Sequence, residues 1–434
     1  MVMTARMRNT VTMAVGLLLA LCLAGPARAD DGPAMDPLLR LLVKKGVITH
    51  EEAVAIQKEY DAMKAGRPAE PEPAAAERTE VVPEAAPERA PAPGGLENLH
   101  LGTLIFASYQ DARVLGPVPG ETVRDSRFTI KRAYLDVRYD VAPFLQARLT
   151  PDVRQDETGD WKGRFKYVYG RFHWERWGFI GKPAIEFGLA HMPWLDWEEA
   201  INGFRMQDPM FMERNHLFNS ADLGVLLGGN FGDELPETYR REVNRHYAGR
   251  WGSFQIGIFN GGGYHSVEQT SNKAVEARVS FRPMPDSAPG FQLTAFGLTG
   301  EGNTAAAPDW NLAALMASWE SPRFVVTAQW ERGKGNQSGR MTDARGRPLE
   351  HEGYSIFGRV RLGERRRWHL IGRWDRFDPD REAAASDVRN RWIAGVGWEF
   401  LANNIWLLDY ERLTHDAPGL PDEHRFQLTL QIKY

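Results

Sequence analysis

The sequence contains a single cysteine, Cys22, and outside its N-terminus it has no apolar run of about 18 residues, the length that a membrane-spanning helix needs. The missing run excludes a helical membrane protein. The mean hydropathy of −0.44 and the charged fraction of 25% would suit a soluble protein. A β-barrel that exposes only every second strand residue to lipid has similar averages. The bulk composition therefore leaves a membrane barrel open.

Residues 1–29 have the organisation of a secretory signal peptide. Two arginines precede an apolar stretch over residues 11–23, and Ala27-Arg28-Ala29 forms a small-residue cleavage site before Asp30. The alternative is a retained membrane anchor, for which the apolar stretch is too short. Cleavage after Ala29 removes Cys22, so we expect a mature chain with neither disulfides nor thiolate chemistry.

Two further segments precede the C-terminal region. Residues 30–66 have helical periodicity, and Thr49 and Glu52 have the spacing of a capping box at the start of a second short helix. Because two short helices bury little surface, we expect them to pack on each other or to form a small coiled coil between subunits. Residues 67–95 are rich in proline, alanine and glutamate, which predicts an extended, semi-stiff linker.

Residues 96–434 alternate between apolar and polar side chains. In the last ten residues, Phe426, Leu428 and Tyr434 belong to an apolar set that alternates with Arg425 and its polar neighbours. A period of two places these sets on opposite faces of one strand, and an apolar face behind a charged face is typical of a strand between lipid and a watery lumen. The alternative, a soluble β-sandwich, fits less well because the strands are long and aromatic residues recur at their ends.

Turn signals divide this region into sixteen strands, joined by connections that are alternately short and long. This asymmetry is typical of outer-membrane barrels. The connection expected at residues 232–244, before a seventh strand expected at residues 245–259, breaks the rule because it is too long for a turn. We therefore predict an all-β fold in which residues 96–434 form a 16-stranded antiparallel transmembrane β-barrel, preceded by the short helical segment and the linker.

Arginines on the expected inward faces are candidates for lining a pore. They are Arg132, Arg138, Arg148, Arg359, Arg361, Arg373 and Arg425. A row of guanidinium groups suits phosphate oxygens. The alternative is that the arginines pair with inward carboxylates such as Asp136 and Asp375 and brace the wall. Net charge does not decide, because residues 96–434 contain 35 arginines and 7 lysines against 44 aspartates and glutamates.

The longest connection, about residues 192–221, is the candidate constriction loop. A barrel of this size leaves an aqueous channel, and a long loop folded inside would narrow it. Its candidate residues are Trp194, Asp196, Glu198, Glu199, Arg205 and Arg214. We expect the two adjacent glutamates to tune selectivity or to pair with the two arginines.

Several short motifs resemble the phosphate-selective porin O and P family, over residues 102–434. The matching segments are Phe128 to Leu135, Ala147 to Val153, Met192 to Trp194, Phe259 to Tyr264, Arg373 to Asp378 and Leu408 to Glu411. The resemblance implies a trimeric, 16-stranded outer-membrane channel with an anion-favouring pore and a third loop folded inward. It also implies that residues 426–434 are recognised by the barrel-assembly machinery.

We therefore predict a porin in the Gram-negative outer membrane, a water-filled channel for passive uptake of small solutes and in particular of anions such as phosphate. The alternative is a structural or adhesive envelope protein with a plugged pore, whose N-terminal segment binds peptidoglycan or another partner. We expect a homotrimer in contact with membrane lipid and lipopolysaccharide, and no nucleic-acid partner. We expect no enzymatic activity, cofactor or metal site.

Overall fold

The computed structural model describes residues 49–55, 58, 96–156 and 158–434. The predicted signal peptide, the linker and most of the helical segment lie outside these residues. Residues 50–55 are helical, and the amide of Thr49 donates to Glu52 Oε2 at 2.7 Å while the amide of Glu52 donates to Thr49 Oγ1 at 3.2 Å. This reciprocal pair confirms the predicted capping box. The chain divides into two units, residues 1–87 and 88–434, which are described separately.

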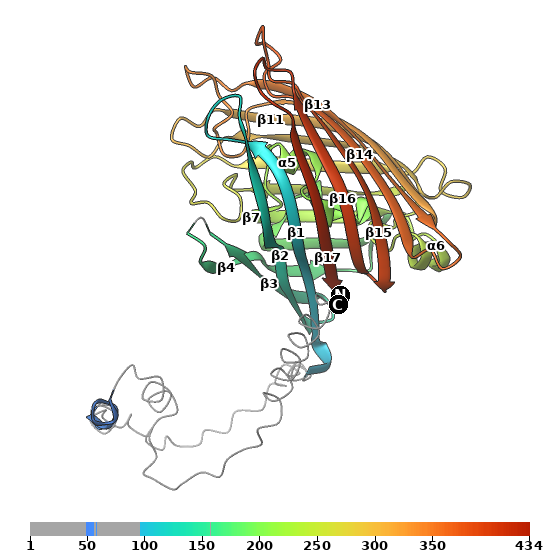
Figure 1. Ribbon diagram of the computed structural model, residues 1–434. Coiled ribbons are helices and arrows are strands. Elements are labelled where there is room, and N and C mark those ends of the chain that lie inside the picture. The colour runs from blue at the N-terminus through green and yellow to red at the C-terminus, as the bar shows by residue number, and fades with distance from the viewer. Residues whose placement is uncertain (1–48, 56–57, 59–95, 157) are drawn as a thin grey trace, which may run out of the picture. The chain divides into compact units, whose positions relative to one another are not determined.

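The second unit is a closed antiparallel barrel (Figure 1). After a short 3-10 helix, η1 (Leu96–Asn98), its strands are β1 (Leu99–Leu115), β2 (Thr122–Ala142), β3 (Leu145–Gln155), β4 (Trp161–His173), β5 (Arg176–Trp177), β6 (Ile180–His191), β7 (Ala221–Phe231), β8 (Gly252–Phe259), β9 (Ala274–Phe281), β10 (Phe291–Glu301), β11 (Asp309–Glu320), β12 (Phe324–Lys334), β13 (Glu350–Leu362), β14 (Trp368–Asp378), β15 (Arg389–Leu401), β16 (Asn404–His415) and β17 (Glu423–Lys433). The two-residue β5 belongs to a turn, which leaves sixteen long strands. Pairing of β1 with β17, from Leu104 opposite Lys433 onward, closes the barrel. The predicted fold is confirmed.

The two ends of the barrel differ in their connections. At the end where β1 begins and β17 finishes, called here the terminus end, most connections are short, such as residues 143–144, 321–323 and 402–403. At the opposite end, called here the loop end, the connections are longer and include residues 335–349 and 379–388. This division agrees with the alternation of short and long connections predicted from the turn signals.

The outer face of the barrel is apolar. Large side chains such as Leu408 (56% exposed) and Trp392 (55%) point away from the lumen. Tryptophans pair across strands on this face, with Trp368 stacked on Trp398 at 6.1 Å between ring centroids and Trp374 against Trp392 at 5.8 Å. Because water does not tolerate so extensive an apolar face, this surface requires a hydrocarbon solvent, and the tryptophan pairs are typical of an interfacial aromatic belt.

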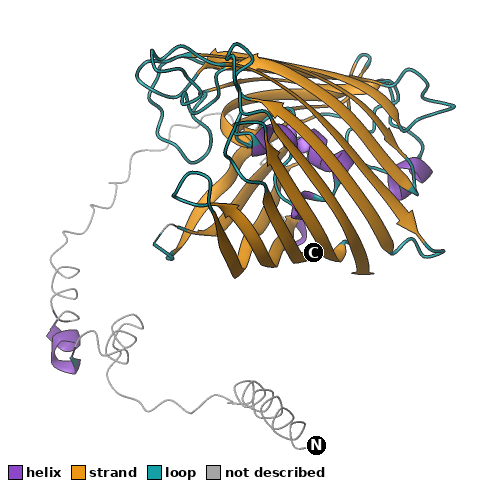
Figure 2. Cartoon of the chain, turned by 45° about the horizontal axis from the view of Figure 1, so that its top comes forward, coloured by secondary structure: helices purple, strands orange, loops and turns teal. Residues whose placement is uncertain are grey.

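Apart from η1, the helices that the structure describes in the barrel unit lie in two connections. Residues 192–220, between β6 and β7, form the inward loop and contain α4 (Leu195–Asn202), η2 (Arg205–Gln207) and α5 (Phe211–Arg214); residues 232–251, the β7–β8 connection, contain α6 (Glu237–Glu242). Figure 2 shows helices inside the ring of strands. In the part of the chain that the structure describes, no helix is both long enough and apolar enough to cross a membrane.

The core of the molecule lies between the inward loop and one side of the barrel. Buried loop residues, among them Trp194, Trp197 and Phe211, share one cluster with inward residues of β10 to β16, among them Phe296 and Phe357. Burial of these apolar surfaces is the force that holds the loop inside the barrel. The loop therefore fills the lumen beside these strands.

One predicted strand boundary is wrong. The seventh strand, expected at residues 245–259, begins at Gly252, so the preceding connection has the bounds 232–251 instead of 232–244. Residues 244–251 form turns, with Asn244 hydrogen-bonded to α4, and Tyr247 (φ 51°) has a left-handed backbone conformation. Such backbone cannot continue a strand ladder.

Candidate functional site

A polar chamber of about 410 Å³ opens inside the barrel beside strands β2 to β8. Its walls come from these strands, from α4 and from the β7–β8 connection. The lining residues with charged or imidazole side chains are Arg138, Arg148, Arg171, Lys182, Glu186, His191, Asp196, Glu234, Arg245 and His246. Strand alternation places the strand members of this set in the lumen, behind the apolar outer face.

Arg148 is the centre of a hydrogen-bonded network in the chamber wall. Its guanidinium donates to Asp136 Oδ1 at 2.6 Å and to the Tyr169 hydroxyl at 3.0 Å, and it lies 2.8 Å from His191 Nε2. Asp136 also accepts Arg138 at 2.7 Å. Asp136 thus braces two of the predicted pore-lining arginines, as the wall-bracing alternative requires.

Cations outnumber carboxylates around the chamber, with five lining arginines and lysines against three lining carboxylates. Their pairing is uneven. Arg171 lies 3.7 Å from Glu186, and Lys182 lies 2.5 Å from Glu175. The guanidinium of Arg245 has no hydrogen bond or ion pair to any residue that the structure describes. The chamber therefore offers an unpaired positive charge, that of Arg245, to a solute in water.

The inward loop presents its apolar side to the opposite wall. The ring of Trp194 lies 5.5 Å from that of Phe296 on β10 and 5.3 Å from that of Trp197, and its indole donates to Glu198 Oε2 at 2.8 Å. Gln329 of β12 donates to the other oxygen of Glu198 at 2.8 Å. Burial raises the pKa of Glu198 to about 7. Among the described residues Glu198 has no ion pair, so the expected pairing with Arg205 or Arg214 is wrong for this glutamate.

Asp208 ties the loop to β2 and to the last strand, β17. Its carboxylate oxygens lie 2.6 Å from Nζ of Lys131 and 3.0 Å from Nη2 of Arg214, and they also contact Arg425. Burial alone would raise the pKa of Asp208, but the charges of Arg425, Lys131 and Arg214 outweigh it and hold that pKa well below its usual range. The backbone of Asp208 is strained, with φ 112° and ψ −178°. These contacts fix the strained residue in place.

Glu411 extends this cluster along the wall. Its Oε2 accepts hydrogen bonds from Nη1 of Arg214 at 3.0 Å and from Nη2 of Arg425 at 2.6 Å, and its carboxylate also contacts Arg391. The predicted residue Arg214 therefore lies between Asp208 and Glu411, away from the glutamates of α4. Arg425 likewise serves a loop anchor and is not free in the lumen.

A second charged cluster joins α4 to β2. Glu199 receives Arg205 at 2.9 Å and lies 3.5 Å from Arg132, which is buried over the rings of Phe106 and Tyr134. Arg205 also reaches Glu213 at 2.6 Å. The expected pairing of Glu199 with Arg205 is confirmed.

The remaining predicted arginines lie on the wall that carries the inward loop. Arg373 pairs with Asp375 at 2.7 Å and donates to the carbonyl of Pro209 at 2.9 Å. Arg359 lies 6.0 Å above the ring of Phe204, and Arg361 has no ion pair within the described part of the chain. The predicted set is thus divided between the two walls and does not form one ladder.

Several residues in these clusters escaped sequence reasoning. Lys131 points inward beside Arg132 because the β1–β2 register shifts at Phe106 and Ala107, a bulge that strict alternation cannot reveal. Arg245 and Tyr247 were assigned to a strand. The mismatch in connection length at residues 232–244 was the available signal for them.

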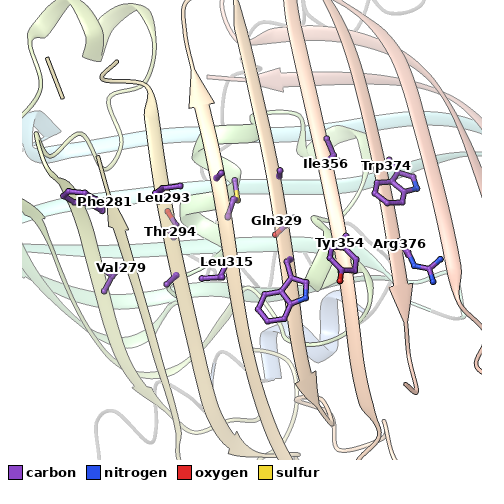
Figure 3. Close-up of a pocket in the computed structure, with 15 residues that line it drawn as sticks. Val279, Phe281, Leu293, Thr294, Leu315, Gln329, Tyr354, Ile356, Trp374 and Arg376 are labelled. Carbon is purple, nitrogen blue, oxygen red and sulfur yellow. The ribbon is translucent and has the colours of Figure 1, made fainter. Parts of the chain in front are cut away.

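A hollow of about 870 Å³ lies on the apolar outer face over β9 to β14 (Figure 3). Leu293, Leu315, Tyr354 and Trp374 line it. Its lining differs from that of the polar chamber, because Arg376 is the one charged residue among the described residues that line it. A groove of this kind on the outer face suits acyl chains or another apolar surface, not a hydrated solute.

No family of known sequences matches this chain, and no curated protein matches it. Solved structures do match its fold. An anion-selective porin from Comamonas acidovorans has a TM-score of 0.53 at 11% identity, over 77% of this chain and 99% of that chain. OmpF of Salmonella typhi, in complex with daunomycin, has a TM-score of 0.52 at 12% identity, over 77% and 97%. The outer-membrane protein OmpT of Vibrio cholerae has a TM-score of 0.50 at 9% identity, again over 77% and 97%.

At these identities the likeness shows the fold alone, and this chain has the barrel fold of outer-membrane porins. The resemblance to the phosphate-selective family and the roles of individual pore residues stay predictions.

Proposed function

We propose that the protein is an outer-membrane porin that passes small hydrated solutes and favours anions. The carrying observation is the polar chamber inside a closed barrel whose outer face is apolar. Lipid solvates the outer face, and water occupies the chamber. This combination suits diffusion of small polar solutes across a membrane.

Anion preference rests on the surplus of cations around the chamber. Arg138, Arg171 and Arg245 line it, and Arg245 has no carboxylate within ion-pair distance among the described residues. A positive surface inside a narrow, low-dielectric wall concentrates anions. Guanidinium groups donate two parallel hydrogen bonds to oxyanions, so phosphate and small carboxylates are the solutes that this chamber suits.

The oligomeric state and the membrane partners belong to the same proposal. We propose a homotrimer in the outer membrane, surrounded by lipid and lipopolysaccharide, with residues 426–434 serving as the recognition segment for the barrel-assembly machinery. In β17, Phe426 and Leu428 are exposed on the outer face, and Tyr434 is 88% exposed. An exposed aromatic terminus leaves this strand accessible to a partner.

Single-channel recording of the purified protein in planar bilayers tests the proposal. We expect discrete conductance steps. In asymmetric KCl we expect a reversal potential close to the equilibrium potential of chloride, and we expect it to decrease in size when phosphate is added to the bath. A reversal potential closer to the equilibrium potential of potassium would refute anion preference but leave the proposal of a pore intact. A complete absence of steps would favour a plugged structural barrel.

A further inference from the structure

The β7–β8 connection, residues 232–251, is a second inward segment, and it enters the lumen from the terminus end. It and the inward loop flank the same strand, β7, so the chain folds inward at both ends of one strand. Most other connections at the terminus end are short turns. A long folded segment there requires an explanation, and its contacts supply one.

The connection has its own internal structure. The amide of Leu235 donates to the carbonyl of Ala248 at 2.8 Å, and an isolated bridge pairs Glu234 with Gly249. Arg240 of α6 pairs with Glu234 at 3.0 Å. These contacts close the segment into a compact hairpin carrying a helix, so its tip has a defined position.

That tip contacts the inward loop and the far wall. The side-chain amide of Asn244 donates to the carbonyl of Ala200 in α4 at 3.0 Å and to Glu320 of β11 at 2.8 Å. The Tyr247 hydroxyl donates to Asp196 of α4. Beyond the tip, Glu242 lies 4.0 Å from Arg366 in the β13–β14 turn. The connection thus reaches from β7 to strands that are distant around the barrel.

Arg278 of β9 joins the two inward segments. Its side chain is completely buried, and Nε donates to the carbonyl of Pro193, at the start of the inward loop, at 3.1 Å. Its guanidinium lies 4.9 Å from the ring of Tyr247 and 5.3 Å from the ring of Trp197. Arg278 therefore contacts both the connection and the inward loop. These contacts hold the two segments at a fixed position relative to each other and to β9.

Four side chains of the connection line the chamber, namely Glu234, Arg245, His246 and Tyr247. Glu234 pairs with Arg240 of α6, whereas Arg245 and His246 line the same chamber as Arg138 of β2. Burial lowers the pKa of His246, Asp196 raises it, and the charges of Arg245, Lys433 and Arg138 lower it further. These interactions agree with the geometry, in which Arg245 and His246 point at the same water-filled space as Arg138.

We propose that the β7–β8 connection is a second constriction element, and that Arg245 and His246 on it meet the permeating oxyanion at the terminus end of the chamber. This inference rests on the proposed channel function. A solute in the chamber passes both Arg245 and Arg138, which line it, and the inward loop supplies neither residue. The connection is therefore a determinant of solute charge in its own right.

Charge reversal within the connection tests this inference. Arg245→Glu should reduce the anion-to-cation permeability ratio about threefold at low salt, because two charges within a few ångströms interact strongly there and are screened at high salt. Arg241→Glu is the matched control. It makes the same charge change in the same segment, but its side chain is 65% exposed, pairs with Glu242 and does not line the chamber. It should leave the ratio unchanged.

The outcomes separate the two proposals. Conducting channels in which Arg245→Glu matches the unmodified protein would overturn the second constriction and leave the porin proposal intact. Equal effects of both variants would also overturn it, because the effect would then be one of net charge. No conductance in the unmodified protein would overturn both. Arg245→Gln, which only neutralises the charge, should give a smaller shift in the same direction and serves if the reversed variant does not insert.

Discussion

The two sides of the barrel interior differ in how much apolar surface they present. Strands β10 to β16 present apolar side chains such as Phe296, Met316 and Phe357 to the lumen, and the inward loop packs on them. Polar groups on this side, such as Arg373, pair with a wall carboxylate or with the loop backbone. Strands β2 to β8 present Arg138, Arg148 and other polar groups, and the chamber lies against them. The outer faces of both sides are apolar. The inward loop therefore packs on one wall, and the space open to a solute lies along the other.

This division explains how the loop holds its position beside the chamber. Burial of its aromatic residues favours the apolar wall, and the ion pairs of Asp208 with Lys131 and of Glu199 with Arg132 fix its edges to β2. Because each of those buried carboxylates contacts more than one cation, removal of the carboxylate would leave buried positive charge uncompensated. The remaining space is bounded by groups that water solvates well.

The largest expected effect comes from breaking the contact between the loop and the apolar wall. Trp194→Ala should weaken docking of the inward loop by about 3–5 kcal/mol, the usual cost of truncating a buried tryptophan. We expect larger and noisier single-channel currents because the freed loop fluctuates. Trp392→Ala, which removes an exposed tryptophan from the outer face, is the control and should leave the currents unchanged. Quiet currents of normal size in Trp194→Ala would contradict the docking account.

Glu198 gives the loop contact a pH dependence. Its pKa is raised to about 7 by burial in the docked loop, against 4.5 in water. A raised pKa means that docking is most favourable below pH 4.5 and weakens as pH rises toward 7, by about 3 kcal/mol in total. We expect current noise to increase over this range in the unmodified protein.

The matched variant for that prediction is Glu198→Gln, which keeps the hydrogen-bonding shape and removes the titration. Its current noise should be independent of pH between 4.5 and 7. If the unmodified protein and this variant share one pH profile, Glu198 does not control docking.

A smaller effect is expected from charge reversal on the two walls. Arg138→Glu on the polar wall should lower the anion-to-cation permeability ratio by a few-fold, because Arg138 lines the chamber. Arg361→Glu on the loop-carrying wall should change the ratio less. Reversal potentials in asymmetric KCl measure both. A larger shift from Arg361→Glu than from Arg138→Glu would place the solute path along the loop-carrying wall and contradict the account.

The sequence predicted the barrel well because the information for it is local. Alternation reports strand faces directly, and in β17 the exposed Phe426 and Leu428 and the buried Gln427 and Thr429 follow it. The third-loop position followed from connection length. These features depend on neighbours in sequence, so a single chain suffices to predict them.

The arrangement of the charged residues could not be predicted in the same way. Asp208 gathers Lys131, Arg214 and Arg425 from three distant parts of the chain, and the bulge at Lys131 shifts a side chain that alternation places outside. Which arginines brace and which stay free depends on such long-range packing. Arg245 was missed because its segment resembles a strand in composition.

The most direct test of the two-wall account is thiol accessibility inside the conducting pore. Gln146→Cys on the polar wall and Thr327→Cys on the loop-carrying wall are compared in a background without Cys22, with a small sulfonate-bearing thiosulfonate reagent added during recording. Gln146 lines the chamber, whereas Thr327 is 4% exposed. We predict a stepwise loss of current for Gln146→Cys and no change for Thr327→Cys. Modification of Thr327→Cys with no effect at Gln146→Cys would contradict the account.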